Sequence, residues 1–139
     1  MNRKPDWENA LWAYINEAST KSFVYGKHDC VQFAAGAFEA MYGVDPLSDL
    51  ENYKSARRAY QLIKKKGDGS LWLAADALLA EYGMQREPTM FANKGDIVGS
   101  YNHEGMEMMG IMEDAGTCTF AAPTGVYRKH LGDVEVRWA

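Results

Sequence analysis

The sequence predicts an α+β fold in which N-terminal helices pack on a C-terminal antiparallel sheet. Up to about residue 86, apolar residues recur at helical spacing, and beyond Glu87 the apolar period falls to two. Apolar residues make up 47% of the 139 residues, which is enough to bury a core, and neither a linker nor an internal repeat separates the two parts. We therefore expect residues 1–139 to form a single domain.

The first two helices are predicted from apolar spacing and from capping residues. Trp7, Leu11 and Ile15 recur at four-residue steps and predict a helix over 7–19, with Asp6 as its N-cap. The second helix has the clearest start, because Asp29 and Gln32 have the spacing of a capping box, and Gly43 supplies its C-terminal stop. We expect this helix to be buried, because its apolar residues lie on most of its sides. These residues are Val31, Phe33, Ala34, Ala35, Ala37 and Phe38.

Two more helices and a set of strands follow. A helix is predicted over 53–65, ended by the Gly67-Asp68-Gly69 segment, and another over 71–82, capped by Ser70 and ended by Gly83. Strands are predicted over 96–101, 107–113, 118–122, 125–128 and 134–138, with a hairpin tip at 102–105. Four methionines in or next to one strand are interpreted as core filling rather than a copper site: Met106, Met108, Met109 and Met112.

The charge balance excludes several function classes. Fifteen Lys and Arg against nineteen Asp and Glu give a net charge of −4, without the basic surface of a nucleic-acid or membrane-surface protein. We expect no membrane span and no signal peptide, since Asp6 and Glu8 interrupt the N-terminal segment where an apolar run is required. A basic run, Arg57-Arg58 and Lys64-Lys65-Lys66, is interpreted as a solvated helix face, with an acidic partner surface as the alternative.

Cys30 is the candidate nucleophile. It opens the second helix, where free N–H groups and the helix dipole stabilise a thiolate. A cysteine hydrolase also needs a base and a group that orients the base, whereas a free cysteine is most often a buried core residue. The other cysteine is Cys118, and neither a CxxC motif nor a Cys/His cluster is present, so no metal or other cofactor is expected.

The residues around Cys30 resemble a known family. The order of three short blocks is similar to that of NlpC-type cysteine peptidases with a papain-like fold, over residues 20–125: an aromatic-Gly approach to Asp29-Cys30, the block Gly95-Asp96-Ile97-Val98, and Met108-Met109-Gly110-Ile111. The chain resembles still more closely a group of small phage tail proteins related to that family, with the segment Tyr53-Lys54-Ser55-Ala56-Arg57-Arg58-Ala59 and a final strand containing Trp138.

The resemblance implies a degenerate active site. Aligning Gly110-Ile111 with the family's Gly-Ile places Met108 where the catalytic histidine belongs, and a thioether cannot accept a proton at neutral pH. The family's third polar position falls near 120–122, which here reads Phe-Ala-Ala. Cys30 is then a vestigial nucleophile. His28 and His103 are the alternative bases, and His130 has no evident partner. Cys118 is expected to be a buried free thiol, with a disulfide to Cys30 as the alternative.

The sequence is consistent with three functions. The leading one is a structural or assembly component of a phage tail tip, made in the bacterial host cytoplasm and then held in the virion tail. It would dock on other tail-tip or hub proteins through strand edges and aromatic anchors, with Trp7, Trp12, Trp72 and Trp138 as candidates. The second is a cysteine hydrolase that acts on peptidoglycan peptides or another amide through Cys30. The third is an inhibitor or immunity-type binding module, which only the acidic balance favours.

Overall fold

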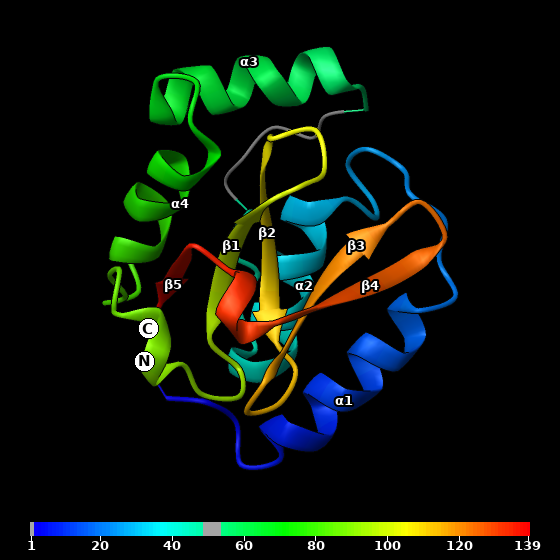
Figure 1. Ribbon diagram of the computed structural model, residues 1–139, viewed down its shortest axis with the longest axis vertical. Coiled ribbons are helices and arrows are strands. Elements are labelled where there is room, and N and C mark those ends of the chain that lie inside the picture. The colour runs from blue at the N-terminus through cyan, green and yellow to red at the C-terminus, as the bar shows by residue number, and fades with distance from the viewer. Residues whose placement is uncertain (1, 49–53) are drawn as a thin grey trace.

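The computed structural model describes residues 2–48 and 54–139, and it confirms the predicted order of helices followed by strands (Figure 1). The α-helices are α1 (Trp7–Ala18), α2 (Cys30–Tyr42), α3 (Ala56–Gly67) and α4 (Leu71–Ala80). The strands are β1 (Ile97–Tyr101), β2 (Glu107–Met112), β3 (Thr117–Ala122), β4 (Gly125–His130) and β5 (Val136–Trp138). Two short 3₁₀ segments that the sequence did not indicate are η1 (Thr89–Phe91) and η2 (Leu131–Asp133). None of the described helices has the length and apolar character that crossing a membrane requires.

The helix starts follow the capping residues, with one exception. The side chains of Asp29 and Ser70 accept hydrogen bonds from the backbone N–H of Gln32 (2.8 Å) and Leu73 (3.2 Å), as predicted. Gly43 ends α2 in the left-handed conformation. Asp6 occupies the predicted N-cap position of α1, but its side chain makes no capping hydrogen bond. Its backbone (φ −104°, ψ 25°) lacks the extended conformation that turns a capping side chain toward the helix.

Helix α3 differs from its predicted bounds. It begins at Ala56 because Ser55 is extended and its hydroxyl accepts a hydrogen bond from Arg58 N–H at 3.2 Å. The predicted start, Tyr53, lies outside the described residues. The helix continues two residues past the expected end and stops at Gly67, where Asp68 adopts a left-handed backbone (φ 52°). Helix α4 stops at Ala80, two residues before the predicted end, and a turn leads to Gly83.

The five strands form one antiparallel sheet in the order β4-β3-β2-β1-β5, which confirms the predicted sheet. Strand β1 pairs along its whole length with β2, from Ile97 opposite Ile111 to Tyr101 opposite Glu107. The pairing of β2 with β3 is shorter and runs from Gly110 opposite Phe120 to Met112 opposite Cys118. In Figure 1, β3 and β4 therefore diverge from β2 toward one end of the sheet, and α2 is visible behind the opening.

A large apolar core joins α1, α2 and α4 to one face of the sheet. Its largest fully buried members include Trp138, Phe33, Phe38 and Ile111. A second set of buried residues, which we call the methionine cluster, consists of Val98, Met108, Met112, Cys118, Phe120 and Val134. The predicted core role is confirmed for Met108, Met109 and Met112, but it was wrong for Met106, which is 60% exposed in the turn before β2.

The tryptophans divide between the core and the surface. Trp72 and Trp138 are 6% and 0% exposed, so they pack inside the molecule and are not available as interface anchors. Trp7 is partly buried against the core, and Trp12 is 67% exposed. Burial of indole rings removes a large apolar area from water, which explains why the core takes these residues.

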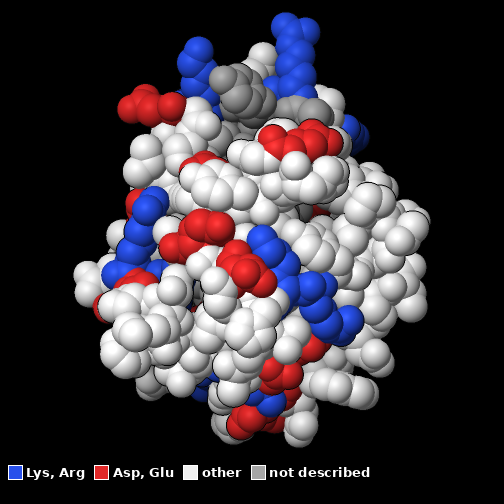
Figure 2. All heavy atoms as spheres, in the orientation of Figure 1, with Lys and Arg blue, Asp and Glu red and all other residues white. Residues whose placement is uncertain are grey.

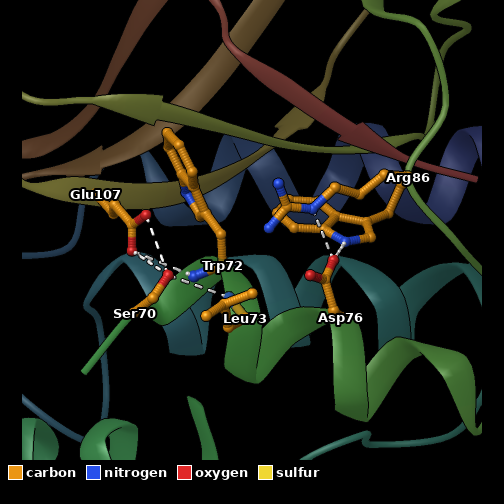
Figure 3. A network of polar contacts seen from close by, with 7 residues as sticks. Ser70, Trp72, Leu73, Asp76, Arg86 and Glu107 are labelled. Carbon is orange, nitrogen blue, oxygen red and sulfur yellow. Dashed lines mark hydrogen bonds and ion pairs between the residues drawn. The ribbon is translucent and has the colours of Figure 1, made fainter. Parts of the chain in front are cut away.

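Helix α4 is attached to the sheet by two carboxylates (Figure 3). Glu107 on β2 accepts hydrogen bonds from the Ser70 hydroxyl (2.9 Å) and from the backbone N–H of Trp72 (3.3 Å), at the N-terminus of the helix. Asp76 on α4 accepts hydrogen bonds from Trp138 Nε1 and Arg86 Nε, both at 2.8 Å. These charge-assisted bonds fix α4 at both its start and its middle.

Candidate functional site

Cys30 lies at the first turn of α2, where the helix meets the opening between β2 and β3. Beyond Gly110, the β2 residues toward Glu107 have no partner on β3. The backbone N–H of Met109 donates a hydrogen bond to the Cys30 sulfur instead. Cys30 also packs against the methionine cluster, to which Met108 belongs. Cys30, the predicted nucleophile, thus lies next to β2 and the methionine cluster, and both of these contain Met108, the predicted base position.

The environment of Cys30 favours the neutral thiol. Burial raises the pKa of Cys30 to about 11, from an ordinary value of 9.0, because removal from water penalises the thiolate. Hydrogen bonds from the backbone amides of Met109, Val31 and Cys30 itself lower the pKa but do not outweigh burial. Among the described residues, the carboxylate of Asp29 adds a repulsion that raises the pKa further. The helix start by itself predicts the opposite shift.

Met108, at the position aligned with the family's histidine, is 6% exposed. Its sulfur accepts a hydrogen bond from the Tyr127 hydroxyl on β4 at 3.3 Å. The residues at the position of the third polar group, 120–122, are all buried, and Phe120 is a member of the methionine cluster. These two positions are therefore occupied by apolar packing residues that neither accept nor hold a proton.

His28 precedes Cys30 by two residues, yet its ring has another role. It is 4% exposed, and its Nε2 donates to the backbone carbonyl oxygen of Gly125 at 2.8 Å. The same loop is held on the β3–β4 turn by hydrogen bonding between Phe23 N–H and the Pro123 carbonyl. His28 therefore ties the segment before α2 to the start of β4. No sequence pattern indicated this contact, which joins residues 97 positions apart.

The other two histidines, His103 and His130, also contact residues other than Cys30. The His103 side chain is 91% exposed at the β1–β2 turn, 3.7 Å from a carboxylate oxygen of Glu104. His130 lies at the start of η2, where its Nδ1 accepts a hydrogen bond from Gly132 N–H at 3.0 Å. His28, His103 and His130 thus contact Gly125, Glu104 and Gly132, respectively.

Cys118 is a buried free thiol, as expected, and Cys30 is free as well. The Cys118 thiol donates to Met112 Sδ at 3.1 Å inside the methionine cluster. Burial raises the pKa of Cys118 to about 11, and the attraction of Lys129 lowers it only in part. No group of three or more His, Cys, Asp or Glu side chains suited to a metal ion occurs within residues 2–48 and 54–139.

Asp29 has two tasks at this site. Its Oδ1 caps α2, and its Oδ2 accepts a hydrogen bond from the backbone N–H of Gly26 at 2.8 Å. Gly26 has a positive φ of 82°, which explains why a glycine precedes the Asp-Cys pair. The aromatic-Gly approach that the sequence analysis singled out is therefore a turn that fixes the start of α2.

The fold is similar to that of a solved peptidoglycan hydrolase domain. The NlpC/p60 domain of the peptidoglycan hydrolase SagA superposes on this chain with a TM-score of 0.55 at 13% sequence identity. The match covers 95% of this chain and 97% of that domain. At this identity the likeness concerns the fold, and it confirms the predicted α+β architecture of the NlpC type.

Two comparisons concern sequence alone. No curated protein matches this chain. A family model described as a domain of unknown function, DUF6950, matches residues 2–139. Because this model covers nearly the whole chain, the chain belongs to the DUF6950 family.

Proposed function

We propose that this chain is a structural or assembly component of a phage tail tip, built on an NlpC-type fold whose active site no longer catalyses hydrolysis. It would be made in the bacterial host cytoplasm, dock on other tail-tip or hub proteins, and remain in the virion tail. The resemblance to small phage tail proteins, from the Asp29-Cys30 start to the final strand with Trp138, points to this role.

The observation that carries the loss of catalysis is the state of the Cys30 thiol. A cysteine nucleophile acts as the thiolate, which needs a neighbouring base or cation. Here burial raises the pKa of Cys30 to about 11, so the neutral thiol predominates at pH 7. Met108 lies in the methionine cluster beside it and accepts a hydrogen bond from the Tyr127 hydroxyl, and His28 donates to Gly125 instead.

Complementation of a phage that lacks this gene tests the proposal. Phage supplied with the Cys30→Ala variant should form tails of normal length and give a titre within about threefold of wild type, because the thiol contributes only packing. Electron microscopy counts the tails, and plaque titre measures their function. A matched control, Trp138→Ala, removes a fully buried ring and should abolish both readouts through loss of folding. Normal folding of Cys30→Ala together with absent tails would contradict the proposal.

The alternative is a cysteine hydrolase acting on peptidoglycan peptides, for which the fold of the SagA domain is the supporting observation. The two functions differ in the reactivity of Cys30. Labelling of Cys30 by iodoacetamide, followed by mass spectrometry of its peptide, should rise about tenfold per pH unit up to about pH 11 if the thiol is inert. A labelling rate that is already maximal at pH 7 would favour the hydrolase.

A further inference from the structure

A cavity lies beside α2, and several of its lining residues also belong to the large apolar core, among them Phe38, Ile97 and Met109. It has a volume of about 210 Å³, is partly open to solvent, and is lined by residues of α2, α3, α4, β1, β2 and the 45–47 segment. Among its described lining residues are Ala35 of α2, Leu62 and Ile63 of α3, and Ala77 and Leu78 of α4. A volume of about 150 Å³ holds a benzene molecule and drug-sized ligands need about 300 Å³ or more, so this cavity suits a single apolar side chain.

Helix α3 covers this cavity without being buried itself. Leu62 and Ile63 line the cavity but remain half-exposed, and among the side chains described for this helix none is fully buried. In contrast, α4 contributes Trp72, Ala75 and Leu79 to the buried core. The apolar stripe of α3 therefore lacks part of the packing that an amphipathic helix normally receives.

The charge of α3 is opposite to that of the rest of the chain. Its sequence, ARRAYQLIKKKG, holds five basic residues and no acidic one. Because the whole chain has a net charge of −4, the remainder carries −9. Arg57, Lys64, Lys65 and Lys66 are exposed. Lys and Arg side chains project outward at the end of the molecule where α3 lies (Figures 1 and 2).

The lysines at the C-terminus of α3 stabilise the helix dipole, which accounts for some of this charge. It does not account for the cavity, whose lining includes Lys66 of α3 together with Asp45 and Glu81, so the excess of positive charge lies on the exposed side of α3 at Arg57, Lys64 and Lys65. A membrane-surface helix would turn its apolar stripe outward to the lipid. Here that stripe faces the cavity between α2 and α4, so a partner must insert an apolar group while its backbone remains near the lysines.

We infer that the cavity beneath α3 is a docking site for an acidic polypeptide segment that inserts one aromatic or branched apolar side chain. Lys66 and its neighbours on α3 attract the acidic flanks, and the inserted side chain supplies the anchor. This inference rests on the proposed assembly role, since it names the surface and the chemistry of the docking partner.

A nuclear magnetic resonance titration of the full chain tests the inference with defined peptides. The probe is a 12-residue peptide of Asp and Glu with a central Phe, compared with the same peptide carrying Ser in place of Phe. The methyl resonances of Leu62, Ile63 and Leu78 should shift with the Phe peptide. The Ser peptide should bind at least about tenfold more weakly, because the anchor is missing.

Variants of the chain then separate the anchor from the charge. Ala77→Phe, at an exposed position of α4 that lines the cavity, should reduce the affinity about tenfold or more by occupying the anchor volume. Lys66→Glu should reduce it about three- to tenfold through repulsion. Lys27→Glu, a matched charge reversal in the loop before α2, should leave the affinity unchanged.

Three results would overturn the inference. The first is a titration in which these methyl resonances do not move. The second is equal binding of the Phe and Ser peptides, which would reduce the site to surface electrostatics. The third is binding to phosphatidylglycerol vesicles, but not to peptides, with the same dependence on Lys66, which would assign α3 to a membrane. If the peptides fail while Cys30→Ala tails still form, the docking site is wrong and the assembly role stands.

Discussion

At the scale of single residues, Cys30 shows that a position at a helix start and removal from water change the pKa of a thiol in opposite directions. The start of α2 favours a thiolate through its free N–H groups, and three backbone amides donate to the sulfur. Removal from water is the larger effect, and it raises the pKa of Cys30 to about 11. A nearby cation would be needed to reverse that balance.

Met108→His tests whether position 108 is where such a cation would act. At pH 7 the imidazole that this substitution introduces would take up the Cys30 proton and pair with the thiolate, so the rate of iodoacetamide labelling at pH 7 should rise about tenfold or more. The polar ring in the methionine cluster should also lower the free energy of unfolding by about 1–3 kcal/mol, measured by urea denaturation.

Met112→His is the matched control, because Met112 belongs to the same cluster and strand but its sulfur contacts Cys118. This variant should lose similar stability and leave the labelling of Cys30 unchanged. An equal rise in the pH 7 labelling rate in both variants, or no rise in a folded Met108→His protein, would show that position 108 is not equivalent to the family's base.

At the scale of elements, the contact between α3 and α4 depends on a glycine. The sequence analysis assigned Gly67 a role in ending α3, and the structure places it as the last residue of that helix. A Cβ atom added at Gly67 would overlap the backbone nitrogen of Ala74 on α4. The absence of a side chain therefore lets the two helices approach closely.

Gly67→Ala should lower the free energy of unfolding by about 1–3 kcal/mol, although alanine is the better helix former, since the overlap forces α3 away from α4. Urea denaturation measures the change. Gly116→Ala is the control, because a Cβ atom there meets nothing within 4 Å, and it should change stability by less than about 0.5 kcal/mol. Equal effects of the two substitutions would contradict a packing role for Gly67.

At the scale of the whole molecule, two thiols with raised pKa values make stability depend on alkaline pH. Burial raises the pKa of Cys30 and of Cys118 to about 11, from 9.0. Unfolded chains release these protons near pH 9, whereas the folded chain keeps them until about pH 11. The stabilisation that comes from keeping both thiols neutral is therefore complete below pH 9 and is lost as the pH rises toward 11.

The difference in unfolding free energy between wild type and the Cys30→Ala/Cys118→Ala variant should therefore shrink from pH 9 to pH 11. The expected slope is up to about 1.4 kcal/mol per pH unit for each thiol. Urea denaturation at pH 8, 9, 10 and 11 measures it, and the subtraction removes the effect of other groups, such as Tyr14, whose pKa burial also raises. A difference that stays constant over these pH values would show that the thiols are not held neutral by the fold.

The sequence by itself determined the local architecture. Apolar periods of 3.6 and 2 separate the helices from the strands, and the short side chains of Asp29 and Ser70 mark helix starts because they bond to amides three residues away. The order of short motifs also led to the NlpC-type fold, which the structural comparison confirms. Periodicity and capping depend on residues that are close along the chain, and the family resemblance depends on the order of short motifs, so both can be read from the sequence.

The tertiary structure alone decided which side chains meet. Trp72 and Trp138 enter the core, His28 bonds to Gly125 across 97 positions, and Met109 offers its amide to Cys30 because β3 diverges from β2. The pKa of a thiol depends on the water around it, and the amount of water depends on residues that packing brings from distant parts of the chain. No local sequence pattern encodes the amount of water around a side chain. The sequence therefore identified Cys30 as the candidate nucleophile but did not predict the pKa of its thiol.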